Sequence, residues 1–120
     1  MIKDFSELIV WQKAMDLVVE TYQLVSKLPN EEKYALSDQM RRAAVSIPSN
    51  IAEGQARNSK KEFVNYLAIA RGSNAELRTQ YAICGRLQYL TETDMTKVCL
   101  LSDEVGKMLN SLIQRLATSH

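Results

Sequence analysis

Residues 36–54, LSDQMRRAAVSIPSNIAEG, carry the clearest helical period in the chain. Apolar positions recur there at steps of three and four residues, which places them on one face of an α-helix. These positions are Leu36, Met40, Ala43, Ile47, Ile51 and Gly54. Ser37 is the expected N-cap, because its hydroxyl can accept a backbone N–H bond. Pro48 cannot donate to the carbonyl of Ala44, so we expect a kink or a restarted helix near Ile47.

Three further amphipathic segments flank this one. The first covers residues 8–28 and ends before Pro29. The third begins at a Ser59–Glu62 capping box and runs for about thirty residues, and the fourth begins after an N-cap at Thr91. Their apolar stripes are Leu8, Trp11, Met15, Val18, Tyr22, Val25 and Leu28; Phe63, Leu67, Ala70, Asn74, Leu77, Tyr81, Cys84 and Gln88; and Met95, Val98, Leu101, Val105, Met108, Leu112 and Leu116.

Short connections between these segments determine how the helices are arranged. A short link places consecutive helices side by side and antiparallel. No strand pattern or internal repeat competes, and 46% hydrophobic with 24% charged residues is typical of a globular protein. The sequence therefore predicts an all-α, antiparallel up-down-up-down four-helix bundle that forms one domain over residues 1–120.

Composition also indicates where such a chain would work. No stretch approaches the roughly 18 consecutive apolar residues of a membrane span, and the first residues do not resemble a signal peptide. We therefore expect a cytoplasmic protein without a membrane partner. In that compartment Cys84 and Cys99 would be reduced thiols, most simply small buried hydrophobic residues.

Residues for familiar kinds of catalysis are scarce. His120, at the very end of the chain, is the one histidine, which argues against di-iron ligand sets, His-dependent acid-base chemistry and Ser-His or Cys-His nucleophiles. Isolated glycines form no phosphate-binding loop. We expect no catalytic residue, metal or cofactor; the weakest alternative is a small-ligand enzyme built on Asn50, Glu53 and Ser73.

A polar stripe runs beside the apolar stripe of residues 36–54 at the same helical spacing. Its members are Gln39, Arg42, Ser46, Asn50, Glu53 and Arg57. A solvated face is one interpretation, but such faces usually favour Lys and Glu, whereas small polar side chains suit a packed, hydrogen-bonded contact. Gly54, Gly72 and Gly85 each cost about 1 kcal/mol of helix propensity, which close helix contacts within or between subunits would offset.

Basic residues must cluster if they are to attract a charged partner, because the net charge is only +1. Arg71 and Arg78 share one flank of the third segment, and the antiparallel layout places Arg42 near Glu76. One hypothesis is a ridge that contacts RNA or DNA phosphates. The other is a salt bridge from Arg42, or from Arg41, to Glu76. The candidate nucleic-acid-binding residues are Arg41, Arg42, Arg57, Lys60, Lys61, Arg71 and Arg78.

Several motifs give the chain a family resemblance. They are Phe5 with Leu8, residues 10–14 (VWQKA), Pro29 with Glu32, residues 39–43 (QMRRA), residues 46–54 (SIPSNIAEG) and residues 70–77 (ARGSNAEL). With these motifs the chain resembles the bacterial 23S rRNA intervening sequence proteins, which are related in fold to the accessory variability proteins of diversity-generating retroelements.

The resemblance implies a non-enzymatic helical bundle that assembles into a homopentameric ring and is encoded, in some bacteria, within an insertion in the large ribosomal RNA gene. The retroelement relatives bind nucleic acid and associate with a reverse transcriptase.

The leading hypothesis is therefore a non-enzymatic homo-oligomer whose clustered basic residues contact RNA or DNA. The alternative is a protein-interaction adaptor with no nucleic-acid role, in which the arginines pair with acids such as Glu53 and Glu76. The residues expected to carry the family motif and the subunit contact are Gln39, Ser46, Pro48, Asn50, Glu53, Gly54, Gly72 and Ser73.

Overall fold

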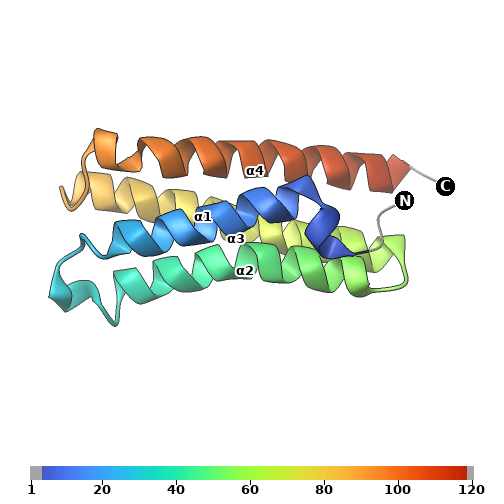
Figure 1. Cartoon of the computed structure of the whole chain (residues 1–120), viewed down its shortest axis with the longest axis horizontal. Helices are drawn as coiled ribbons and strands as arrows, with labels where there is room; N and C mark the ends of the chain where they lie inside the picture. The colour runs from blue at the N-terminus through green and yellow to red at the C-terminus, as the bar shows by residue number, and fades with distance from the viewer. Residues whose placement is uncertain (1–3, 119–120) are drawn as a thin grey trace.

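A computed structural model describes residues 4–118, and within them the chain forms four long α-helices and no strand. The long helices are α1 (Ile9–Val25), α2 (Leu36–Ala56), α3 (Lys60–Arg86) and α4 (Glu92–Thr118), and two 3-10 helices, η1 (Phe5–Glu7) and η2 (Asn30–Glu32), precede α1 and α2. Consecutive helices run antiparallel (Figure 1). The predicted all-α four-helix bundle is confirmed, whereas His120 lies outside the described residues.

The bundle is elongated, with extents of 48 × 23 × 19 Å. Each helix packs against two others, in the cyclic order α1, α2, α3, α4. Figure 1 shows the α1–α2 and α3–α4 connections together at one end, and η1, the α2–α3 connection and the last turns of α4 at the other. Residues at opposite ends of one helix are therefore far apart on the surface.

The start and end of two helices differ from the sequence expectation. α1 ends at Val25, because the next amides, those of Lys27 and Leu28, donate to carbonyls three residues back and tighten the chain into turns. α2 begins at Leu36, so Ser37 is not its N-cap. The Ser37 side chain is instead buried inside the first turn.

The other predicted helix signals have mixed outcomes. α2 continues through Pro48 to Ala56, so the helix does not restart near Ile47, and the alternative of a kink there stays a prediction. The Ser59 cap is confirmed, because its hydroxyl accepts the Glu62 amide at 3.0 Å. Thr91 caps α4 by accepting the Asp94 amide at 3.1 Å, and the Asp94 carboxylate accepts the Thr91 amide at 2.9 Å.

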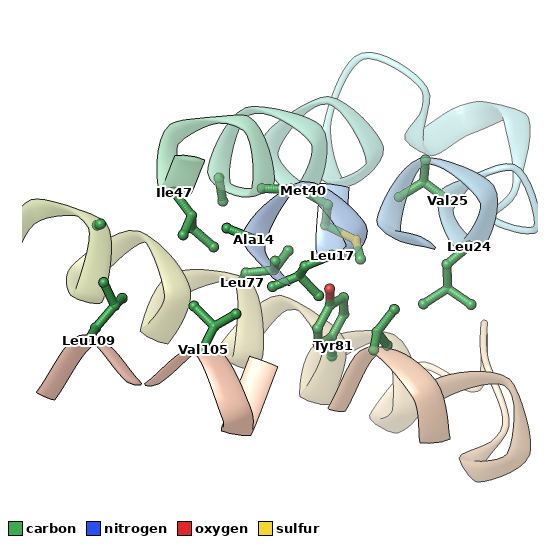
Figure 2. Close-up of a cluster of buried hydrophobic side chains, with 14 of the residues drawn as sticks. Ala14, Leu17, Leu24, Val25, Met40, Ile47, Leu77, Tyr81, Val105 and Leu109 are labelled. Carbon is green, nitrogen blue, oxygen red and sulfur yellow. The ribbon is translucent and has the colours of Figure 1, made fainter. Parts of the chain in front are cut away.

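The core shows that α1 carries two apolar stripes. Leu17 is fully buried and points toward Met40 and Tyr81 (Figure 2). Met15 and Tyr22, which the sequence analysis placed on the core face, are 39% and 46% exposed. The buried residues of α1 are Val10, Ala14, Leu17, Thr21, Leu24 and Val25. Of the predicted stripe, Val25 and the flanking Leu8 and Leu28 are therefore core residues as expected. Both stripes satisfy the helical period, and the stripe predicted to face the core was the one with the larger side chains.

Several polar groups in the core are paired with one another, whereas the buried Gln80 Oε1 has no hydrogen-bond partner among the described residues. The Thr21 and Tyr81 hydroxyls lie 2.6 Å apart. Asn74 donates to the Ser102 carbonyl at 3.0 Å, and the Ser102 hydroxyl donates back to the Asn74 amide oxygen at 2.8 Å. Burial raises the pKa of the Tyr81 phenol, although the bond to Thr21 opposes part of this effect. These bonds let buried polar atoms join α1 and α4 to α3 without a desolvation penalty.

The two cysteines have different environments. Cys84 is buried as predicted, and burial raises the pKa of its thiol to about 11. Cys99 on α4 is exposed, so its expected burial is wrong. Cys99 lies outside the apolar stripe that begins at Met95, so the helical period gave no support for a core position.

Candidate functional site

The polar flank of α2 faces α3 within the same chain. The Ser46 and Ser73 hydroxyls lie 2.8 Å apart, which joins the two helices. Asn50 donates to the Ser46 carbonyl at 2.8 Å and to its hydroxyl at 2.9 Å. Ser46, Asn50 and Ser73 are half-buried. Their small polar side chains thus form a hydrogen-bonded helix contact, of the kind that the sequence predicted.

Gly54 makes the closest approach between α2 and α3. A Cβ atom at this position would lie 2.7 Å from the Tyr66 Cβ and 3.0 Å from the Phe63 Cδ1. Gly72 faces open space, with nothing within 4 Å of such an atom, so its predicted close contact is wrong within this chain. At Gly85 the nearest atom is the flexible Met95 methyl at 3.2 Å.

A charged cluster closes the α2–α3 connection. Arg57 donates to Glu53 at 2.9 Å and to the Tyr66 hydroxyl at 2.8 Å, and its guanidinium lies over the Tyr66 ring. The hydrogen bond to Glu53 is the main cause of the raised pKa of Arg57. Glu53 and Arg57 are therefore occupied with each other in this chain.

The residues predicted for subunit contact do not form one surface in this chain. Ser46, Asn50, Glu53, Gly54 and Ser73 line the α2–α3 contact described above. The other three lie elsewhere: Gln39 is exposed, Gly72 faces open space, and Pro48 lies on the opposite flank of α2, beside α1. A subunit contact through this set stays a prediction.

Three of the predicted nucleic-acid-binding arginines form ion pairs. Arg42 meets Asp38 at 3.2 Å, Arg57 meets Glu53 at 2.9 Å, and Arg78 reaches Asp103 at 4.0 Å. All three pairs are at least 40% exposed on each side chain, so water and salt weaken their attraction.

The remaining predicted cations have other environments. Arg41 donates to the Lys33 carbonyl at 3.1 Å, and Arg71 donates to the Asn110 amide oxygen at 3.1 Å. Lys60 and Lys61 are exposed in the first turn of α3. Among the described residues no ion pair joins Arg41 or Arg42 to Glu76, so that predicted salt bridge is wrong.

The structure does not bring these cations into one surface. Arg41 and Arg42 lie in the second turn of α2, whereas Arg57, Lys60 and Lys61 lie at the far end of this helix. Fifteen residues separate Arg42 from Arg57, which is about 22 Å along the helix axis. Arg71 and Arg78 lie on the side of α3 that contacts α4. Any nucleic-acid contact would therefore be spread along the bundle.

An apolar surface that the sequence analysis missed lies along the outer side of α1 and α2. A shallow groove of about 340 Å³ runs there, lined by Trp11, Met15, Val18, Val45, Pro48, Ser49 and Ala52. Tyr22 continues the α1 row. We call the set Trp11, Met15, Val18, Tyr22, Val45, Pro48 and Ala52 the α1–α2 apolar surface. Its signal in the sequence is the second helical stripe of α1, which was assigned to the core.

Residues 4–118 contain neither a metal-ligand group nor a membrane-spanning helix. No group of three or more His, Cys, Asp and Glu side chains in this part of the chain could hold a metal ion. Asn50 and Ser73, proposed with Glu53 as an enzyme alternative, line none of the main pockets of the described chain and are joined through Ser46. No described helix has the length and apolar character needed to cross a membrane.

Comparison with known proteins identifies the family. The sequence model of the 23S rRNA-intervening sequence proteins matches residues 6–111. The chain belongs to this family. A similar solved structure is a Bacteroides thetaiotaomicron protein of unknown function from the S23 ribosomal protein family, at 30% identity and a TM-score of 0.81. The match covers 88% of this chain and 96% of that one. No curated protein matches significantly.

For this 23S rRNA-intervening sequence protein, the matched region contains the whole of α1, α2 and α3 and most of α4. It includes the α2–α3 contact and the whole of the α1–α2 apolar surface. The motif of residues 46–54 divides between the two: Ser46 and Gly54 contact α3, whereas the buried Pro48 and the half-buried Ala52 line the groove beside α1.

Proposed function

We propose that this protein is a non-enzymatic homo-oligomer whose subunits meet through the α1–α2 apolar surface. The exposure of large apolar side chains there is the observation that carries the proposal. Met15, Tyr22 and Val45 are 39%, 46% and 40% exposed, on adjoining rows of two neighbouring helices. Contiguous exposed apolar residues are typical of an interface, whereas single ones are ordinary surface.

The physical gain comes from removing this surface from water. Burial of apolar area stabilises an assembly by roughly 25 cal/mol per Å². In an oligomer each subunit buries this surface against one or two neighbours. The charged flank of α1 supports the same assignment, because Lys13 pairs with Glu104 and Glu20 pairs with Lys97 on the side that faces α4. The two flanks of α1 therefore differ sharply in character.

The mass of the protein in solution tests this proposal. We expect light scattering after gel filtration to give an oligomer for the wild type and a smaller species for Tyr22→Glu and Val45→Glu. Leu100→Glu is the matched control, because Leu100 is 66% exposed on α4 and outside this surface. A monomeric wild type, or an equal loss of mass in all three variants, would contradict the proposal.

A second candidate function, nucleic-acid binding, is favoured by the environment of Arg71. This guanidinium has an amide oxygen, not a carboxylate, as its partner. Arg71 is exposed and could exchange that neutral acceptor for a phosphate. Assembly would also bring together basic residues that one subunit holds apart. Binding to structured RNA and duplex DNA should then weaken steeply with salt, and Arg71→Glu should weaken it in the intact oligomer.

The adaptor alternative predicts a different result from the same experiment. Its supporting observation is the pairing of Arg42, Arg57 and Arg78 with acids of the same chain. An intact oligomer that binds no nucleic acid at low salt would favour the adaptor. Nucleic-acid binding by the wild type that is lost in Arg71→Glu would exclude the adaptor alternative.

A further inference from the structure

A second groove of the described chain lies between the start of α1 and the last turns of α4, away from the α1–α2 apolar surface. It has a volume of about 730 Å³. We call it the α1–α4 groove. It is lined by Glu7, Leu8, Ile9, Val10, Lys107, Met108, Ser111, Leu112, Arg115 and Leu116. The groove is thus apolar along its floor and carries polar groups along its edges.

The α4 edge of this groove is basic. Lys107, Ser111 and Arg115 recur every four residues, so they form one exposed row along α4. Lys107 already pairs with Asp103 at 3.2 Å, whereas Arg115 has no ion pair with any residue between 4 and 118. Arg115 is therefore a cation beside an apolar floor, available to an acidic group on whatever fills the groove.

The opposite edge supplies an exposed apolar anchor. Ile9, in the first turn of α1, is 62% exposed, the highest value among the aliphatic residues of α1. The half-buried Leu112 and Leu116 of α4 lie across from it in the groove. An apolar side chain placed here would cover Ile9 and gain contacts on both walls.

The length of the groove suits a helix. From Lys107 to Leu116, α4 advances about 13 Å, or two and a half turns. A helix of about ten residues laid along this track would present two or three apolar side chains to the floor, at i, i+4 and i+7. Acidic residues on its flank would then face Arg115 and Lys107.

We propose that the α1–α4 groove binds an amphipathic helical segment of a partner protein, with leucine-like side chains on the floor and acidic residues facing Arg115 and Lys107. Charge complementarity selects this occupant, because Lys107 and Arg115 lie along the α4 edge of the groove, whereas the acidic Glu7 lies at its η1 end. The proposal is independent of the homo-oligomer proposed above, because it uses α4 and Ile9 instead of the outer side of α1 and α2.

The test uses a fluorescent synthetic helix of about 14 residues, with leucines at helical spacing and glutamates on the flanks, and a twin peptide with lysines in place of the glutamates. Fluorescence anisotropy measures binding to the full-length protein. We expect the acidic peptide to bind about tenfold more tightly than its basic twin. Arg115→Glu should weaken the acidic peptide by about tenfold and strengthen the basic one.

The matched control is Arg86→Glu, the same charge change on an exposed residue at the end of α3, which lies at the other end of the bundle from the groove. It should leave both affinities unchanged, whereas Ile9→Glu should weaken both peptides. No binding, equal binding of the two peptides, or equal effects of Arg115→Glu and Arg86→Glu would each overturn the proposal. Loss of oligomeric mass in Ile9→Glu alone would also overturn it, because the groove would then hold a second copy.

Discussion

The two flanks of α2 differ in what they contact. Toward α3, Ser46, Asn50 and Gly54 form hydrogen bonds or allow close backbone approach, so that flank is sealed inside the chain. Toward α1, Val45 and Ala52 border an open apolar groove. The polar flank looked like the functional surface in the sequence, but in the structure it is mainly an internal contact. The apolar flank, which resembled ordinary core, is the one left open to a partner.

This difference has a simple physical origin. Small polar residues and glycine let two helices approach closely while every polar atom still finds an acceptor or donor. Large apolar side chains hold helices farther apart and leave a groove along the outer side of the pair. The size and polarity of the side chains on a flank therefore indicate how closely two helices pack, and they do not by themselves identify a functional surface.

The largest expected effect distinguishes the two apolar stripes of α1. Leu17→Ala should lower the free energy of unfolding by about 2–5 kcal/mol, because Leu17 is fully buried and its loss leaves a cavity. Met15→Ala should cost less than about 1 kcal/mol in a monomeric background, since Met15 is 39% exposed. Urea unfolding of both in a Tyr22→Glu background measures the difference. Equal losses of unfolding free energy would mean that the two stripes contribute equally to the core of the monomer.

The close approach at Gly54 gives the next largest effect. Gly54→Ala should destabilise by about 1–3 kcal/mol, because its Cβ would lie 2.7 Å from the Tyr66 Cβ and helices would have to shift. Gly72→Ala is the control and should stabilise by up to about 1 kcal/mol, since it gains helix propensity in open space. Thermal unfolding compares them. A Gly54→Ala protein more stable than wild type would show that the contact is loose.

Two serines, Ser46 and Ser49, compare the flanks of α2 directly. Ser46→Ala removes the bonds to Ser73 and Asn50 and should cost about 1 kcal/mol. Ser49→Ala, on the apolar side, should change the free energy of unfolding by less than about 0.5 kcal/mol in a monomeric background. Chemical denaturation measures both. If Ser46→Ala left the free energy of unfolding unchanged, these hydrogen bonds would not stabilise the contact between α2 and α3.

The smallest effect comes from an exposed pair outside α2. Asp94 accepts hydrogen bonds from Thr91 and Lys27, which lower the pKa of its carboxyl from 3.8 to about 2. A lowered folded-state pKa stabilises the fold above pH 3.8, and this stabilisation is lost as the pH falls toward 2. Asp94→Asn should therefore flatten the loss of stability over that window, as followed by thermal unfolding against pH. If stability fell with pH as steeply in Asp94→Asn as in the wild type, the hydrogen bonds to Asp94 would not contribute to the stability of the fold.

Much of the fold could be predicted because the helical period and the capping residues act locally. The caps at Ser59 and Thr91 needed only neighbouring residues, and both are present. The wrong assignment on α1 arose because Met15 and Leu17 lie on stripes with the same period, and only packing against α3 and α4 decides between them. A period identifies a face but not the neighbour that covers it.

The candidate site was less predictable for the same reason. Arg42 pairs within its own helix with Asp38, and not with Glu76, because an i, i+4 partner is near in any helix whereas a cross-helix partner depends on register. The separation of Arg41 from Lys61 likewise follows from the length of α2 and was not visible in composition. Surfaces shared between helices need coordinates.

Trp11, the single tryptophan, tests the central claim without a label, because it is half-buried and belongs to the α1–α2 apolar surface. Acrylamide quenching of its fluorescence can be compared between the wild type and Tyr22→Glu, whose substitution lies three helical turns away. The account predicts that Trp11 is protected in the wild-type oligomer and more readily quenched in a smaller, equally helical Tyr22→Glu protein. Identical quenching in the two proteins, at whatever mass each has, would contradict assembly through this surface.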